Sequence, residues 1–350
     1  MMDKTNINRL ISMTGSASAI AVITHMKPDG DAMGSSLAMY RFLKAYFSAD
    51  VSIVLNDRYP QNLAFMVKDD EQKDIFIHNE DEDGTRCAIA GADLIICLDF
   101  NAFHRTDRLE PLLAGASCSK ILIDHHLSPD EKAFDLVFSD TSSSSASELL
   151  YHILKETPQC AGSAAGIPLD AAEALMTGMT TDTNNFSNSA TPATFAMASE
   201  LIAMGVDRNR ILSNLFNQFG ENRLRLLGTV LKDLMTITED GVSYIVLDAE
   251  TIRRYGIDEG DTEGFVNMPL SIRDIRMSLF LKEDGDRVRV SIRSKQGTSA
   301  NRCARLYFNG GGHENAAGGR LYLGKEISDI SQAGSYIEKH THIFFTENEA

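Results

Sequence analysis

The first half of the chain alternates short apolar runs with segments of helical periodicity. The runs at 19–25, 51–56, 92–100 and 120–126 are rich in β-branched residues and predict four strands. Strands that alternate with helices are typical of βαβ units and a parallel sheet. We therefore predict an α/β fold whose first domain, residues 1–190, contains a doubly wound, mostly parallel sheet.

The pattern changes after this domain. Residues 191–238 have the periodicity and the Thr, Asp and Glu starts of successive helices, which predicts a helical connector. Residues 239–345 return to short alternating runs, with an Asp-Gly-Asp turn at 284–286 that predicts a hairpin. The connector is thus expected to lead into a second, smaller α+β domain.

The composition fits two globular domains and disfavours extended nucleic acids as ligands. The chain has 350 residues, 43% of them hydrophobic, which is enough for two cores. Its 33 basic and 49 acidic residues give a formal charge of −16, which repels polyphosphate chains unless bound cations neutralise part of it. No apolar run approaches the roughly 18 residues of a membrane span, and the N-terminus lacks a secretory signal. We expect a cytoplasmic protein with no membrane partner.

Residues that bind metals gather at the ends of the predicted strands. His25 closes the first strand, and Asp29 and Asp31 flank a glycine in the turn that follows. Asp99 ends the third predicted strand. Taken alone, the first group also fits an ordinary turn, and Asp99 a helix cap. Because ligands of open α/β sheets bind beyond the carboxyl ends of the strands, their shared position favours a site.

A second group follows the fourth predicted strand. Asp124, His125 and His126 end an apolar run, and adjacent histidines beside an aspartate rarely serve packing alone. Neighbouring side chains on a strand point to opposite faces, so one histidine can bind a metal while the other faces substrate. Asp182 ends a helix-like segment, where a polar cap is the alternative.

Together these histidines and aspartates form a ligand set for two divalent cations. Mixed imidazole and carboxylate ligands favour Mn²⁺ over Mg²⁺ or Ca²⁺, and the five scattered cysteines form no thiolate site for Zn²⁺. Two ions about 3.5–4 Å apart can activate a water and orient a phosphorus for in-line attack. We therefore predict two divalent ions as cofactors, Mn²⁺ in preference to Mg²⁺.

The predicted second domain carries a basic strand face and a glycine-rich loop. Along residues 287–293, arginines alternate with valine and isoleucine, so that one face packs and the other is basic. The loop at 308–319 offers closely spaced backbone N–H groups and His313, which together can grip a phosphate or a base. A solvated sheet face and a plain glycine-rich hairpin are the alternatives.

The order and spacing of these motifs resemble the Asp-His-His (DHH) phosphoesterase superfamily. The positions that carry the resemblance are His25, Asp29, Asp31, Asp99, Asp124, His125, His126 and Asp182. The segment 310–318 resembles the signature of the DHH-associated domain. The resemblance extends over almost the whole chain. It is strongest to the nanoRNase/pAp phosphatase proteins, which degrade very short RNAs and 3′-phosphoadenosine 5′-phosphate (pAp).

The resemblance implies two sets of metal ligands with one residue in common. The first ion would be held by His25, Asp29 and Asp99. The second ion would be held by Asp31, Asp99, His125 and Asp182. Asp99 would therefore bridge the two ions.

The resemblance also implies residues that act on the substrate. His126 would lie near the scissile phosphate and Asp124 would orient the histidines, so these two and Asp99 are the expected catalytic residues. The residues expected to bind substrate are Arg105, Arg293, Gly311, Gly312 and His313.

The expected reaction is hydrolysis of very short oligoribonucleotides to mononucleotides, together with dephosphorylation of pAp. Its partners would be short RNA and small nucleotides, without long nucleic acid. Cyclic di-AMP or its linear product pApA is an alternative substrate for the same chemistry. A pyrophosphatase is disfavoured by the glycine-rich segment, and a long-chain exonuclease by the acidic charge. A non-catalytic nucleotide sensor is the alternative from another class, and a homodimer is left open.

Overall fold

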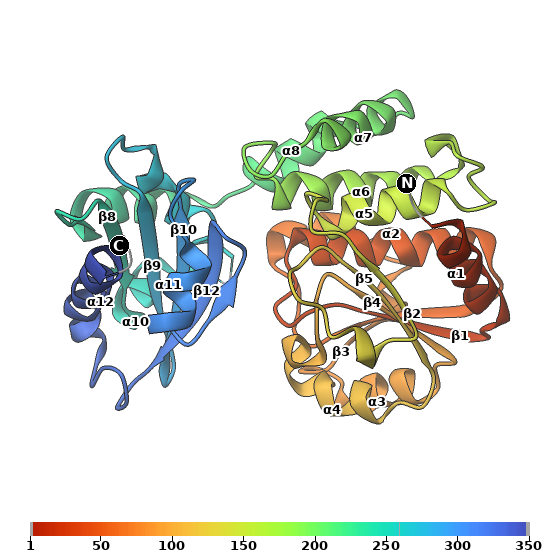
Figure 1. Cartoon of the computed structure of the whole chain (residues 1–350), viewed down its shortest axis with the longest axis horizontal. Helices are drawn as coiled ribbons and strands as arrows, with labels where there is room; N and C mark the ends of the chain where they lie inside the picture. Colours follow the sequence, from red (N-terminus) through yellow and green to blue (C-terminus); the bar gives the residue numbers. More distant parts are fainter. Residues whose placement is uncertain (1–2, 259, 348–350) are drawn as a thin grey trace. The chain divides into compact units, whose positions relative to one another are not determined.

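The structure of the chain, a computed structural model, describes residues 3–258 and 260–347 (Figure 1). The Cα positions divide the chain into two compact units, residues 1–218 and 219–350. Each unit has its own sheet and its own hydrophobic cores. In the described part of the chain, no helix is long and apolar enough to cross a membrane.

The first unit is built on a six-stranded sheet in which every neighbouring pair of strands is parallel. The strands lie in the order β3-β2-β1-β4-β5-β6. The order reverses between β1 and β4, and in doubly wound sheets this reversal opens a crevice at the carboxyl ends of the strands. The predicted α/β class is therefore confirmed. The strands are β1 (Ala19–Ile23), β2 (Asp50–Leu55), β3 (Ile75–Ile77), β4 (Leu94–Leu98), β5 (Ser119–Asp124) and β6 (Leu136–Ser139).

Helices cover both faces of this sheet, as Figure 1 shows. One face packs against α2, α5 and α6, with apolar residues of α1, α7 and α8 in the same core. The other face packs against α3 and α4. The bounds are α1 (Lys4–Ser16), α2 (Gly30–Tyr46), α3 (Glu82–Ala90), α4 (Glu110–Gly115), α5 (Ala146–Lys155), α6 (Leu169–Asp182), α7 (Pro192–Ala203) and α8 (Arg208–Phe216), with a 3₁₀ helix η3 (Phe103–Leu109) between β4 and α4.

The second unit contains a mixed sheet in the order β11-β12-β10-β9-β8-β7. One face packs against α11 and α12. Part of the other face packs against α9, α10 and the 3₁₀ helix η7 (Phe265–Ser271). The bounds are β7 (Met235–Ile237), β8 (Val242–Leu247), β9 (Met277–Asp284), β10 (Arg287–Ser294), β11 (Gly311–Gly312), β12 (Ala316–Tyr322), α9 (Glu221–Thr229), α10 (Ala249–Tyr255), α11 (Ala300–Tyr307) and α12 (Ala333–Glu347).

The hairpin between β9 and β10 forms where the sequence predicts it. Gly285 occupies the turn with φ +68°, in the left-handed region that glycine adopts without strain. Along β10, Val288, Val290 and Ile292 are buried, and the arginines between them are partly exposed. The predicted alternation of a packed face and a basic face is confirmed.

Most of the segment 191–238 is helical, but its last part, Met235–Ile237, is strand β7 of the second sheet. The helices of the segment are shared between the two units. Helices α7 and α8 contribute Met197, Leu201 and Ile211 to the core of the first unit. Helix α9 contributes Leu226 to a core of the second. The division between the compact units therefore falls within this helical segment, at residue 218.

Candidate metal centre

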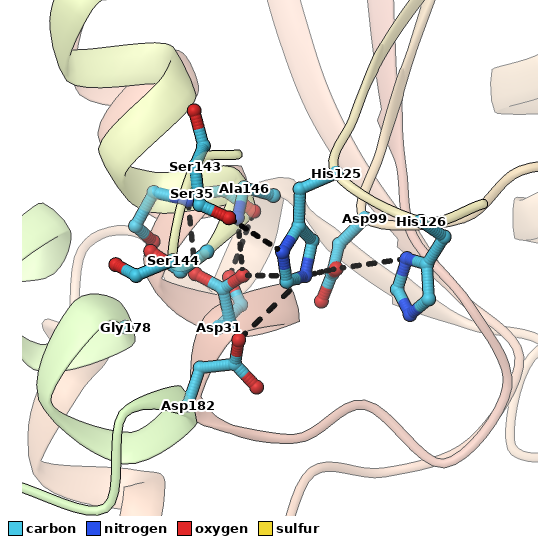
Figure 2. A network of polar contacts seen from close by, with 12 residues as sticks. Asp31, Ser35, Asp99, His125, His126, Ser143, Ser144, Ala146, Gly178 and Asp182 are labelled. Atoms are coloured by element: carbon cyan, nitrogen blue, oxygen red, sulfur yellow. Dashed lines mark hydrogen bonds and ion pairs between the residues drawn. The ribbon is translucent and has the colours of Figure 1, made fainter. Parts of the chain in front are cut away.

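The candidate residues of the first unit meet at the carboxyl ends of three neighbouring strands. His25 follows β1, Asp99 follows β4 directly, and Asp124 is the last residue of β5. Strands β1 and β4 are adjacent and flank the point where the strand order reverses. The end of α6 adds Asp182. The expected ligands thus come together from segments that are far apart in the sequence, and Figure 2 shows Asp31, Asp99, His125 and Asp182 side by side.

The turn after β1 is shaped by hydrogen bonds around Asp29. Its side chain caps α2, because Oδ1 accepts from the backbone N–H groups of Asp31 at 3.0 Å and Ala32 at 3.1 Å. The same oxygen lies 3.8 Å from Nε2 of His25. Lys27 has φ +52°, and its N–H donates to Oδ2 of Asp57 at 2.8 Å. This reversal of the chain brings Asp29 back towards His25.

Asp99 lies at the centre of the cluster. Its Oδ2 is 3.5 Å from Nε2 of His25, and its Oδ1 is 3.5 Å from Nε2 of His125 and 3.7 Å from Nδ1 of His126. Its φ of +64° is uncommon for a residue with a side chain and costs about 1–3 kcal/mol. Within the described residues, the buried Oδ1 has no hydrogen-bond partner. A strained, buried carboxylate between histidines is the arrangement expected of a cation ligand.

In each of the three histidines of the cluster, Nδ1 lies within hydrogen-bond distance of an oxygen atom. Nδ1 of His25 is 2.8 Å from the carbonyl oxygen of Met26, and Nδ1 of His125 is 3.3 Å from that of Ser143. Nδ1 of His126 is 2.7 Å from Oδ1 of Asp124. A carbonyl oxygen only accepts, so Nδ1 carries the proton and Nε2 of the neutral ring is left as the ligand atom. Such partners are the usual supports of histidines that bind metals.

Asp31 is held by the beginning of α5. The N–H of Ala146 donates to its Oδ2 at 2.6 Å, and the N–H of Ser147 donates to its Oδ1 at 2.9 Å. The positive end of the helix dipole favours a carboxylate there. A Cβ on Gly178 would lie 2.9 Å from Oδ1 of Asp31, so glycine permits the close approach of α6. Figure 2 shows this carboxylate beside the ring of His125.

His125 lies close to the carboxylates of Asp31, Asp99 and Asp182, which form one half of the cluster with it. Its Nε2 lies 3.9 Å from Oδ2 of Asp31, 3.5 Å from Oδ1 of Asp99 and 3.6 Å from Oδ2 of Asp182. Burial alone would lower its pKa, but these carboxylates raise the pKa of His125 to about 10. Burial and the negative charges of Asp99 and Asp29 raise the pKa of Asp182 to about 7, although His125 opposes the shift.

The pKa values of the other carboxylates also show that the cluster needs positive charge. Burial, then the charges of Asp99 and Asp182, raise the pKa of Asp31 well above its usual range. Burial would likewise raise the pKa of Asp99, but the contacts with His125 and His25 lower it. Carboxylates this close are tolerated only where protons or cations neutralise them.

The geometry fits divalent cations. His25, Asp29 and Asp99 present ligand atoms within 4.8 Å of one another, and so do Asp31, Asp99 and His125. Asp99 belongs to both groups. The donors are imidazole nitrogens and carboxylate oxygens, a set that suits divalent first-row cations. The described residues of this unit therefore provide what a metal centre requires.

The structure also shows the surroundings of the residues expected to bind substrate. Arg105 lies in η3, and its carbonyl oxygen accepts from the N–H of Met26 at 2.8 Å, which ties η3 to the turn after β1. Its role in substrate binding stays a prediction. In the second unit, Arg293 is on β10, in register with Ala316 of β12 and with Ser278 of β9.

The glycine-rich loop of the second unit is a tight hairpin. The N–H of His313 donates to the carbonyl oxygen of Ala316 at 2.8 Å. Gly312 has φ +151°, and a Cβ there would lie 2.6 Å from the same oxygen, so the hairpin itself requires glycine. A Cβ on Gly311 would find its nearest neighbour at 3.5 Å, so packing does not explain that glycine. Substrate binding by the three residues stays a prediction.

Several contributors to the centre have no signal in the motifs. The carbonyl oxygen of Ser143 and the N–H groups of Ala146 and Ser147 act through the backbone, so their residue types say nothing about the contact. Asp57 contributes through its side chain, which accepts from the backbone N–H of Lys27, but it lies outside the motifs. Only the start of α5 could be recognised from the sequence, because its cap is a serine in the run of serines at 142–145.

Comparison with known proteins agrees with this site. A model of the DHH family, N-terminal domain, matches residues 19–179, and a model of the DHHA1 domain matches residues 241–337. The bifunctional oligoribonuclease and PAP phosphatase NrnA of Bacillus subtilis is 31% identical over 334 residues, covering 93% of this chain and 96% of that protein. The protein of the same name from Thermus thermophilus is 30% identical and covers 86% and 84%.

A solved structure shows the same fold. The crystal structure of an exopolyphosphatase-related protein from Bacteroides fragilis has a TM-score of 0.89 and 34% sequence identity, covering 99% of this chain and 98% of that chain. The two domain matches fall in the two compact units, one in each. The chain therefore belongs to the DHH family of phosphoesterases and carries a DHHA1 domain in its second unit.

Proposed function

We propose that this protein hydrolyses very short oligoribonucleotides to mononucleotides and removes a phosphate from pAp, with Mn²⁺ as its metal. The relatives from Bacillus subtilis and Thermus thermophilus are named for both activities, at 31% and 30% identity. The observation that carries the proposal is the position of Asp99, which is shared by the group of His25 and Asp29 and the group of Asp31 and His125. Cyclic di-AMP and pApA are less favoured substrates, because the names of these relatives mention neither.

The metal ligands of the first unit would form two groups that share Asp99. His25 and Asp29 would hold one ion, and Asp31, His125 and Asp182 would hold the other, with Asp99 shared. When bound, the two ions would polarise the phosphoryl group and make a nearby water more acidic. The geometry supports this division, because Oδ2 of Asp99 faces His25 and its Oδ1 faces His125.

His126 would act on the substrate. Its Nδ1 is fixed by Asp124, which leaves Nε2 to contact an oxygen of the scissile phosphate or of the leaving group. In the second unit, Arg293, His313 and the N–H groups of Gly311 and Gly312 would bind the remainder of the substrate, and Arg105 would bind phosphate in the first. The formal charge of −16 disfavours long nucleic acids. We expect the protein to act in the cytoplasm.

A substrate panel tests the proposal. Purified full-length protein, stripped of metal and supplied with Mn²⁺, should release AMP from pAp and mononucleotides from RNAs of two to five nucleotides. A 24-mer RNA, cyclic di-AMP and inorganic polyphosphate should react more slowly. Polyphosphate is included because the similar solved structure is described as exopolyphosphatase-related. Faster turnover of polyphosphate or cyclic di-AMP than of pAp and dinucleotides would contradict the proposed substrate class.

A further inference from the structure

One buried carboxylate near the centre belongs to none of the groups described above. Glu148 is the third residue of α5 and is 1% exposed. Its Oε2 accepts hydrogen bonds from the N–H of Ser144 at 3.2 Å, from the hydroxyl of Ser144, and from the hydroxyl of Thr194 at 2.8 Å. Burying an ionised carboxylate is costly unless hydrogen bonds compensate it. These hydrogen bonds compensate the burial of Glu148 and connect it to Ser144 and Thr194.

Glu148 holds the segment that precedes α5. The segment is a run of serines, whose small polar side chains bury little apolar surface. Ser145 caps α5, because its hydroxyl accepts from the N–H of Glu148 at 2.9 Å. In a capping box the acidic side chain returns to the N–H of the cap residue, whereas here it reaches the residue before the cap, Ser144. The carboxylate of Glu148 thereby fixes the backbone at Ser144, in the segment that faces the metal centre.

The end of this serine run and the first two residues of α5, together the segment 143–147, supply three hydrogen bonds to two candidate ligands. The carbonyl oxygen of Ser143 accepts from Nδ1 of His125, and the N–H groups of Ala146 and Ser147 donate to Asp31. Figure 2 shows Ser143 and Ala146 next to the ring of His125 and the carboxylate of Asp31. Asp31 and His125 belong to one of the two groups of ligands, whereas His25 and Asp29 belong to the other. The segment thus supports one half of the centre.

We propose that Glu148 is a positioning residue for the metal ion held by Asp31 and His125, and that it acts through Ser144 on the segment 143–147. The inference rests on one part of the proposed function, the binding of an ion at each half of the centre, and not on the substrate. Without the carboxylate, the carbonyl oxygen of Ser143 is free to turn away from His125, and the imidazole loses the partner that selects its tautomer. The ion next to His25 and Asp29 has no such dependence on Glu148.

A matched control is available on the same pair of helices. Glu200 of α7 accepts from the hydroxyl of Tyr151 at 2.6 Å and from Nζ of Lys155 at 2.7 Å, both on α5. It therefore links α5 to α7, as Glu148 does through Thr194, but its hydrogen bonds among the described residues go to Tyr151 and Lys155 and not to the segment 143–147. Glu200→Gln should weaken this link between the helices without changing the metal centre.

The experiment is calorimetric titration of Mn²⁺ into the metal-free full-length protein, with thermal unfolding as a check of folding. Glu148→Ala should weaken binding of one ion by about 10–100-fold, the range for partners of metal ligands. Binding of the other ion should stay within about threefold. Glu148→Gln keeps one acceptor oxygen and should lie between Glu148→Ala and wild type. Should Glu148→Ala fail to fold, Glu148→Gln still gives the comparison. Glu200→Gln should bind both ions as wild type does.

Activity provides a second readout. Because Glu148 does not touch the reacting atoms, turnover of Glu148→Gln should approach that of wild type at saturating Mn²⁺ and fall behind at low Mn²⁺. Two unchanged affinities in the Glu148 variants would overturn the inference, and so would an equal loss for both ions. Wild-type protein that binds two ions but cleaves neither pAp nor short RNA would overturn the proposed function and leave this inference standing.

Discussion

Replacing Asp99 by asparagine isolates the charge at the centre of the cluster. Asparagine has nearly the same shape and also tolerates the left-handed conformation, so the φ of +64° can be kept. The two carboxylate oxygens face different groups of ligands, with Oδ2 3.5 Å from His25 and Oδ1 3.5 Å from His125. The substitution therefore removes a charged ligand from both ions at once.

The expected loss follows from this double role. Changing a partner of a metal ligand typically costs 10–100-fold in affinity, and loss of a ligand itself should cost at least tenfold, or about 1.4 kcal/mol, for each ion. Binding of the pair should weaken at least about a hundredfold, or about 2.7 kcal/mol. Hydrolysis of pAp and dinucleotides should fall below about a tenth of the wild-type rate at a Mn²⁺ concentration that saturates the wild type.

The assay is the same Mn²⁺ titration, followed by measurement of AMP release from pAp. Asp107→Asn is the matched control, because Asp107 is exposed and also has a positive φ, of +53°. It should bind Mn²⁺ and turn over substrate as wild type does. An Asp99→Asn protein that binds two ions with wild-type affinity would refute the idea that Asp99 is shared.

Three further predictions concern protons, the paired histidines and the second unit. Bound ions must displace protons from the ligands whose pKa values the cluster raises, namely His25, Asp31, His125 and Asp182, so Mn²⁺ affinity should rise as the pH rises; calorimetry from pH 5.5 to 8.5 checks this direction, and a flat profile would contradict it. His125→Ala should lose one ion, whereas His126→Ala should lower turnover and retain both; metal analysis of the two purified variants decides, and loss of an ion from His126→Ala would reverse the assignment. Arg293→Ala and His313→Ala should slow hydrolysis of pAp and dinucleotides by about ten- to a hundredfold but spare a small artificial phosphodiester; equal losses on both substrates would refute a role in holding the natural substrate.

The candidate ligands could be predicted because their positions follow from the strand pattern. His25, Asp99 and Asp124 stand where apolar runs end, and the carboxyl ends of parallel strands meet at one edge of the sheet. The hairpin at Gly285 could also be predicted, because an Asp-Gly-Asp turn between two runs of alternating apolar and polar residues is typical of a hairpin. Local pattern and topology agree at these positions.

The features that the sequence did not predict depend on tertiary packing or on the backbone. Strands β3 and β6 have only three and four residues, too short for a periodicity to appear. The carbonyl oxygen of Ser143 and the N–H of Ala146 contribute without their side chains. The division of the helical segment at residue 218 is set by which core each helix packs against.

The glycines of the second unit show how one residue can have two explanations. Gly312 is required by a hairpin in which a Cβ would lie 2.6 Å from the carbonyl oxygen of Ala316. Its presence therefore does not by itself indicate substrate binding. Gly311 has no such close neighbour, and a substitution by alanine there should test ligand contact without disturbing the hairpin.

Anomalous diffraction at the manganese absorption edge, from crystals of the full chain grown with Mn²⁺, tests the central claim most directly. Two peaks about 3.5–4 Å apart are expected. One should lie beside His25 and Asp29 and the other beside Asp31 and His125, with Asp99 bonded to both. A single peak, or two peaks of which one has no bond to Asp99, would contradict a two-metal centre built around this carboxylate.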